Sequence, residues 1–127
     1  MGASVLVVDD DATLRTLLTA VFTGAGLRVL GAASAEEALD LLDADRVDLV
    51  VTDARMPGMN GAELTAVLRG RPETADVPVF LCTGSHVAEI IAAAEAAGVT
   101  GVLPKPMRPK ELLAAVLPYV AETADPR

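Results

Sequence analysis

The sequence predicts an α/β protein built on one doubly wound parallel sheet. Five short apolar runs alternate with longer segments in which apolar residues recur at helical spacing. Most of the short runs are continuously apolar, which is typical of parallel strands covered by helices on both faces. Parallel strands also need long crossovers, and a helix fits between each pair of runs.

The expected strands are short and rich in Val and Leu. Aliphatic residues are expected there because a chain with 2% aromatic residues must build its core from aliphatic side chains. β-branched residues favour such extended segments. The strands are expected at Val5–Val8, Arg28–Ala32, Asp48–Thr52, Val77–Cys82 and Gly101–Leu103.

The expected helices follow the strands in order, each with apolar residues three and four positions apart. The last helix begins at about Pro109, and Pro118 is expected to end or kink it because proline lacks an N–H donor. The four earlier helices are expected to include Leu14–Phe22, Ala38–Leu42, Leu64–Leu68 and Val87–Ala94.

Capping signals support these helices. Ser34–Glu37 has the pattern of a capping box, and Asn60–Glu63 has a weaker form of it. Ser85 is placed to cap the fourth helix. Gly26 and Gly98 follow helical segments where a left-handed residue is expected.

Length and charge limit the classes of function. With 127 residues the chain is expected to form one domain over 1–121, followed by a polar tail over 122–127. A net charge of -8 argues against direct contact with nucleic acid or an anionic membrane. The single cysteine excludes an internal disulfide, and no signal peptide or spanning segment is recognised, so a cytoplasmic location is expected.

Polar residues gather where the expected strands end. Asp9, Asp10 and Asp11 follow the first strand, and Asp53 follows the third. Thr83 comes after the fourth, and Lys105 after the fifth. Ligands of doubly wound sheets bind beyond the carboxyl ends of the strands, so these residues are expected to share one site.

Each of these residues alone has an ordinary explanation, as a helix cap, a turn residue or a solvated lysine. Together they suit phosphoryl chemistry. Converging carboxylates bind a hard cation such as Mg²⁺, and a lysine with a hydroxyl can hold phosphoryl oxygens. A carboxylate needs no general base to attack phosphorus, so an aspartyl phosphate is the expected product.

These motifs resemble the receiver domain of bacterial response regulators. The resemblance rests on Asp9-Asp10, Asp53, the loop MPGMNG (Met56–Gly61), Thr83 and Lys105-Pro106, and it covers about Val5 to Val120. It implies a flavodoxin-like (βα)5 fold with strand order 2-1-3-4-5. It also implies a phosphoacceptor signalling domain, catalysing only its own phosphorylation and dephosphorylation, that switches binding to an unknown downstream protein.

The resemblance further implies individual roles. Asp53 receives the phosphoryl group from a histidine kinase or histidine phosphotransfer protein. Asp10, Asp53 and the main-chain carbonyl of Arg55 ligate Mg²⁺, and Asp9 acts through a metal-bound water. Phosphoryl oxygens are bound by Thr83, Lys105, the N–H groups after Asp53 and that of Gly84.

One position departs from the family pattern. Val102 stands where the family usually has a Tyr or Phe that responds to the threonine Thr83. A valine cannot swing as a ring does, so activation is expected to act near the site, in the loop after the fourth strand and in Lys105–Met107. Leu14 and Pro106 are expected to form the docking edge for the phosphodonor.

Two alternatives stay open at this point. DDDAT (Asp9–Thr13) also resembles the signature of haloacid-dehalogenase-type phosphatases, with Asp9 as nucleophile and Asp11 as acid/base, although that family gives no role to Asp53. The other alternative is a receiver that binds partners without being phosphorylated.

Overall fold

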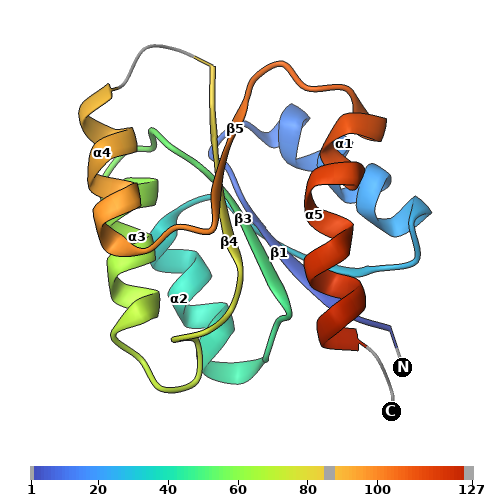
Figure 1. The fold of residues 1–127 in the computed structure, drawn as a ribbon, viewed down its shortest axis with the longest axis horizontal. Helices are drawn as coiled ribbons and strands as arrows, with labels where there is room; N and C mark the ends of the chain where they lie inside the picture. The colour runs from blue at the N-terminus through green and yellow to red at the C-terminus, as the bar shows by residue number, and fades with distance from the viewer. Residues whose placement is uncertain (1, 85–87, 125–127) are drawn as a thin grey trace.

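The computed structural model describes residues 2–84 and 88–124, and it has the predicted flavodoxin-like architecture. Five parallel strands form one sheet in the order β2-β1-β3-β4-β5 (Figure 1). Both the fold class and the strand order are therefore confirmed. The strands are β1 (Ser4–Val8), β2 (Arg28–Ala32), β3 (Leu49–Asp53), β4 (Val79–Thr83) and β5 (Gly101–Pro104).

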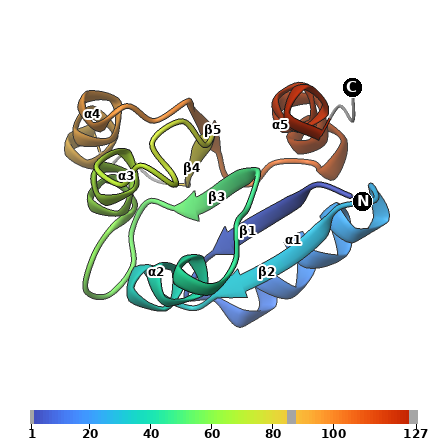
Figure 2. The ribbon, with the colours of Figure 1, turned by 90° about the horizontal axis from the view of Figure 1, so that it is seen from below.

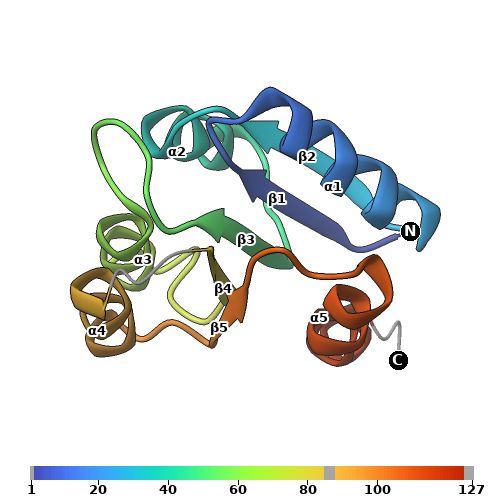
Figure 3. The same cartoon turned by 90° about the horizontal axis from the view of Figure 1, so that it is seen from above.

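The helices connect these strands and cover both faces of the sheet. They are α1 (Ala12–Gly24), α2 (Ala35–Ala44), α3 (Gly61–Arg69), α4 (Ala88–Ala97) and α5 (Pro109–Ala124). Figure 2 shows α1 and α5 on one face of the sheet and α2, α3 and α4 on the other. Figure 3 shows the same layers from the opposite side. None of the helices in the described residues is long and apolar enough to cross a membrane.

The core explains why the strand sequences are continuously apolar. Val5 and Val7 of β1 pack under α1 and α5, whereas Leu6 and Val8 pack under α2 and α3. None of these four side chains is more than 1% exposed. The alternation that would give one polar face is absent because both faces of β1 are covered.

Three expected strands, β3, β4 and β5, end one residue later than predicted at the edge that carries the site. Asp53 and Thr83 were expected to follow their strands, but each is the last residue of its strand. The pairing continues because Asp53 lies opposite Cys82, and the N–H of Ala54 donates to the Cys82 carbonyl at 2.9 Å. Backbone pairing, rather than side-chain polarity, therefore determines where these strands end.

Pro118 was expected to end or kink the last helix, and the structure shows that it does not end it. α5 continues through Pro118 to Ala124 and so reaches into the segment 122–127 that was expected to be a polar tail. Proline removes one backbone hydrogen bond, but Val116 and Val120 on either side are 0% and 3% exposed. Burial of this face against the sheet holds the helix together across the missing bond.

The relative strength of the two capping boxes is also corrected. Asn60 has the complete box, because its side chain accepts from the Glu63 N–H and the Glu63 side chain accepts from the Asn60 N–H. Ser34 forms only half of one, since the Glu37 carboxylate bonds the N–H of Ala33 instead. The left-handed glycines are confirmed, with φ of 90° at Gly26 and 98° at Gly98, and the expected cap Ser85 lies outside the described residues.

Candidate functional site

The predicted site lies where the sheet changes winding direction. β1 and β3 are neighbours in the sheet, yet the chain leaves β1 through α1 and leaves β3 through α3, which cover opposite faces (Figure 2). The connections therefore diverge beyond the carboxyl ends of these two strands, which is where doubly wound sheets bind their ligands. Carboxylates from both strand ends lie together at this point.

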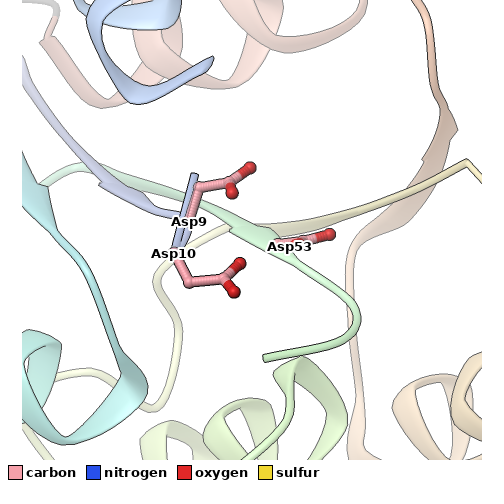
Figure 4. A group of neighbouring side chains, drawn as sticks. All are labelled: Asp9, Asp10 and Asp53. Atoms are coloured by element: carbon pink, nitrogen blue, oxygen red, sulfur yellow. The ribbon is translucent and has the colours of Figure 1, made fainter. Parts of the chain in front are cut away.

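Asp9, Asp10 and Asp53 form the predicted acidic cluster. Each offers a carboxylate oxygen that lies within 4.8 Å of the other two (Figure 4). Asp9 is buried, Asp53 is half-buried and Asp10 is exposed, so the cluster opens to solvent on the Asp10 side. Hard oxygen donors in this number suit Mg²⁺, which keeps several of its waters when protein carboxylates bind it.

Lys105 is the cation of the site. Its Nζ donates to Asp53 Oδ1 at 2.9 Å and lies 3.4 Å from Asp9 Oδ2. Burial alone lowers the pKa of Lys105, but the hydrogen bond and charge of Asp53, followed by those of Asp9, outweigh burial and leave the pKa raised. The lysine therefore stays protonated and links the ends of β1 and β3 to β5.

Asp9 carries an electrostatic cost. Its pKa is raised, first because burial penalises the charged form and also because of the charge on Asp53. The N–H of Asp11, which donates to Asp9 Oδ1 at 2.9 Å, and the charge of Lys105 oppose this shift without cancelling it. A bound divalent cation would offset this cost, because it adds positive charge beside the buried carboxylate.

Asp11 has a different task from its two neighbours. Its Oδ1 accepts from the N–H groups of Thr13 and Leu14, at 2.9 and 3.2 Å, and thereby caps α1. Arg15, one turn into the helix, donates from Nη1 to the carbonyl of Asp9 at 2.7 Å. The start of α1 therefore fixes the backbone that carries Asp9 and Asp10, a role of Arg15 that the sequence did not reveal.

The loop after Asp53 is compact. Gly58 has a φ of 78°, and the Gly61 N–H donates to the Ala54 carbonyl at 3.0 Å. The Ala54 N–H is already bonded to the carbonyl of Cys82, so it does not serve as a phosphoryl donor as the sequence suggested. The N–H of Arg55 is the next candidate along the loop.

Thr83 and Lys105 are brought together at the ends of β4 and β5. The Lys105 N–H donates to the Thr83 carbonyl at 2.9 Å. A Cβ added at Gly84 would lie 3.0 Å from the Lys105 Cβ, so this glycine keeps the loop close to the lysine. Val102 lies opposite Leu81, two strand positions before the Thr83–Pro104 pair, and it is half-buried. It packs against the cluster of Ala54, Ala62, Leu81 and Ala94.

An apolar groove of about 390 Å³ adjoins the site between α1 and the loop that follows β5. Leu14 and Pro106, the predicted docking edge, both line this groove. Gly84 and Lys105, which belong to the candidate site, line it as well. Leu17, which the sequence analysis did not assign to this edge, also lines the groove and is 53% exposed. Exposure of a large apolar side chain on a helical face is the signal that identifies it.

Comparison with known proteins gives a consistent result. The family model of the response regulator receiver domain matches residues 5–117. The chain is 40% identical over 116 residues to the cyclic di-GMP phosphodiesterase response regulator RpfG of Xanthomonas campestris, covering 90% of this chain and 31% of that protein. It is 35% identical over 123 residues to the transcriptional regulatory protein YvrH of Bacillus subtilis, covering 96% and 51%. The chain thus spans about half or less of the length of these relatives.

The solved structures agree with the sequence comparison. The chemotaxis protein CheY4 of Vibrio cholerae superposes with a TM-score of 0.88 at 31% identity, covering 94% of this chain and 99% of that one. A response regulator receiver protein from Pseudomonas putida gives a TM-score of 0.86 at 30% identity, with 93% and 98% covered. The chain belongs to the response regulator receiver domain family of two-component systems.

Proposed function

We propose that Asp53 accepts a phosphoryl group from a phosphohistidine of a histidine kinase or a histidine phosphotransfer protein. The observation that carries this proposal is the carboxylate cluster of Asp9, Asp10 and Asp53, with Lys105 Nζ 2.9 Å from the Asp53 carboxylate. Family membership supports phosphoacceptor signalling in general, and this cluster supports the particular residue.

The transfer is a displacement at phosphorus. An Asp53 carboxylate oxygen forms the new P–O bond while the P–N bond to the donor imidazole breaks, and the imidazole keeps the electron pair of that bond. Lys105 Nζ pairs with Oδ1 of the attacking carboxylate at 2.9 Å. Thr83 and Lys105 then bind the phosphoryl oxygens, together with the N–H groups of Arg55 and Gly84.

Mg²⁺ is the proposed cofactor. Asp10, Asp53 and the main-chain carbonyl of Arg55 would hold it directly, and Asp9 would contact it through a water molecule. When bound, the metal neutralises charge on the phosphoryl oxygens. The buried position of Asp9 suits an indirect role, because its carboxylate is already bonded by the Asp11 N–H and Lys105.

The apolar groove is the proposed docking surface for the phosphodonor. It is continuous with the site, since Gly84 and Lys105 contribute to both, and it presents Leu14, Leu17 and Pro106 beside the acceptor. A helical protein with apolar side chains around its phosphohistidine fits this surface. Docking there would place the phosphohistidine beside Lys105.

The output of the protein is proposed to act through protein contacts. RpfG is named a cyclic di-GMP phosphodiesterase and YvrH a transcriptional regulator, but the aligned part covers only 31% and 51% of them. With a charge of -8, this chain is proposed not to contact nucleic acid or an anionic membrane itself and to act in the cytoplasm. In this proposal the chain catalyses only its own phosphorylation and dephosphorylation, and it acts on no separate substrate.

The test is phosphorylation by a small acyl phosphate in the presence of Mg²⁺, followed by intact mass and site mapping. We expect one added phosphoryl group on the wild type and none on Asp53→Asn. Asp40→Asn, which removes an exposed carboxylate of α2, is the matched control and should be modified normally. Modification at Asp9 would instead support the phosphatase alternative, and no modification would support a receiver that only binds partners.

A further inference from the structure

Glu36 of α2 contacts the loop that follows the phosphoacceptor strand. Its Oε2 accepts a hydrogen bond from the N–H of Met59 at 3.3 Å. The same carboxylate lies over Gly58, because a Cβ added there would come within 3.1 Å of Oε2 and 3.6 Å of Oε1. Met59 is 23 positions away from Glu36, so this contact joins elements that are distant in the sequence.

The loop between Ala54 and Asn60 is held at both ends by hydrogen bonds with the start of α3. The Gly61 N–H donates to the Ala54 carbonyl at 3.0 Å, and the Asn60 capping box fixes the start of α3. Among the described residues, Glu36 is the side chain from another helix that hydrogen-bonds the middle of this loop. It therefore restrains the part of the loop that the end contacts leave free.

We propose that Glu36 is a positioning residue for the metal site: it holds residues 55–59 in the conformation in which the Arg55 carbonyl serves Mg²⁺. This inference rests on the proposed function. A loop that is already ordered loses less conformational entropy when its carbonyl binds a metal, so the contact raises the affinity without touching the ion. Gly58 permits the close approach of the carboxylate, because it has no side chain to displace it.

Three variants separate this role from a general effect of charge. Glu36→Ala removes the acceptor, whereas Glu36→Gln keeps an oxygen that can accept from Met59 and removes the charge. Asp40→Ala, one turn further along α2, removes an exposed carboxylate that forms no hydrogen bond among the described residues.

The measurements are Mg²⁺ affinity by calorimetry and amide hydrogen exchange of Met59 in the metal-free protein. For Glu36→Ala we expect affinity weaker by about three- to tenfold, as for the loss of one hydrogen bond, and faster exchange at Met59. Glu36→Gln should recover most of the affinity, and Asp40→Ala should match the wild type.

Two results would overturn the inference. One is that Glu36→Ala and Asp40→Ala show the same affinity and the same exchange at Met59. The other is that Glu36→Gln is as weak as Glu36→Ala, which would assign the effect to charge rather than to the hydrogen bond. Failure of the proposed function is distinguishable, because it would appear as a wild-type protein that neither binds Mg²⁺ nor accepts a phosphoryl group at Asp53.

Discussion

Replacing Gly61 by alanine tests how tightly the phosphoacceptor strand is packed against α3. A Cβ at this position would lie 2.5 Å from the main-chain oxygen of Asp53 and 2.5 Å from Leu81 Cδ1. Leu81 can rotate, but the Asp53 oxygen belongs to the backbone of β3. Because φ at Gly61 is not positive, the cost of alanine here is steric rather than conformational.

The size of the effect follows from the required movement. The contact must lengthen by about 0.9 Å to reach ordinary van der Waals distance, which begins at 3.4 Å. Overpacking of this kind costs about 1–3 kcal/mol in the free energy of unfolding. For a domain of this length that lowers the thermal midpoint by about 4–12 °C. If β3 moves instead of α3, Asp53 shifts relative to Lys105, and a displacement near 1 Å can slow phosphorylation by about a hundredfold.

The assay combines thermal unfolding with the rate of phosphorylation by an acyl phosphate. Unfolding should be followed by circular dichroism, because the chain has no tryptophan. Gly24→Ala is the matched control: nothing lies within 4 Å of the added Cβ at the end of α1, so this variant should keep or raise the midpoint. A Gly61→Ala protein that melts and reacts like the wild type would refute the steric argument.

Three further outcomes are expected. Asp9→Asn should stabilise the metal-free protein near pH 7. The pKa of Asp9 is raised in the folded protein, so its protonated form favours folding. This stabilisation is complete below the unfolded-state pKa and is lost as pH rises through the folded-state pKa, where the buried carboxylate becomes charged. Melts in a chelator from pH 4 to pH 7 should show this gain growing with pH, and a lower midpoint for the variant at pH 7 would contradict it. Lys105→Met should reduce phosphorylation by about a hundredfold yet tighten Mg²⁺ binding, as measured by kinetics and calorimetry; weaker metal binding would be contrary to this expectation. Activation with a beryllofluoride mimic should shift backbone NMR signals mainly around Gly84 and Lys105, because Val102 has no ring to move; large shifts along the outer faces of α4 and α5 would exclude this local mechanism.

The fold was predictable because burial on both faces of the inner strands β1 and β3 makes their sequences continuously apolar. β1 contains no polar position after Ser4 since each side chain from Val5 to Val8 meets a helix layer. The strand order, in contrast, came from the family resemblance. Helix ends were less predictable, and Pro118 shows why: the missing donor is a local signal, whereas the burial of Val116 and Val120 that outweighs it depends on the packed sheet.

The sequence predicted which side chains gather at the strand ends, but it did not predict the burial and contacts of each one. Asp9, Asp10 and Asp11 are adjacent in sequence, yet the first is buried, the second is exposed in the cluster and the third caps α1. Residue type alone cannot separate them, because all three are aspartates at the end of the same strand. Glu36 was missed for a related reason: its sequence context is that of an ordinary acidic residue in the first turn of a helix, and its contact with Met59 exists only after folding.

The charge balance of the site links its resting state to its chemistry. Two of the three clustered carboxylates pair with Lys105, whose Nζ is shared between Asp53 at 2.9 Å and Asp9 at 3.4 Å. In the proposed function the same lysine must bind phosphoryl oxygens, so it has to leave at least one of these carboxylates. A divalent cation makes that exchange favourable, because it supplies the positive charge that Asp53 and Asp9 would lose. Lys105 and the metal therefore compete for the same oxygens before transfer and act on the same phosphoryl group after it. In the proposed function, the ion pair between Lys105 and Asp53 is therefore also the contact that metal binding would weaken.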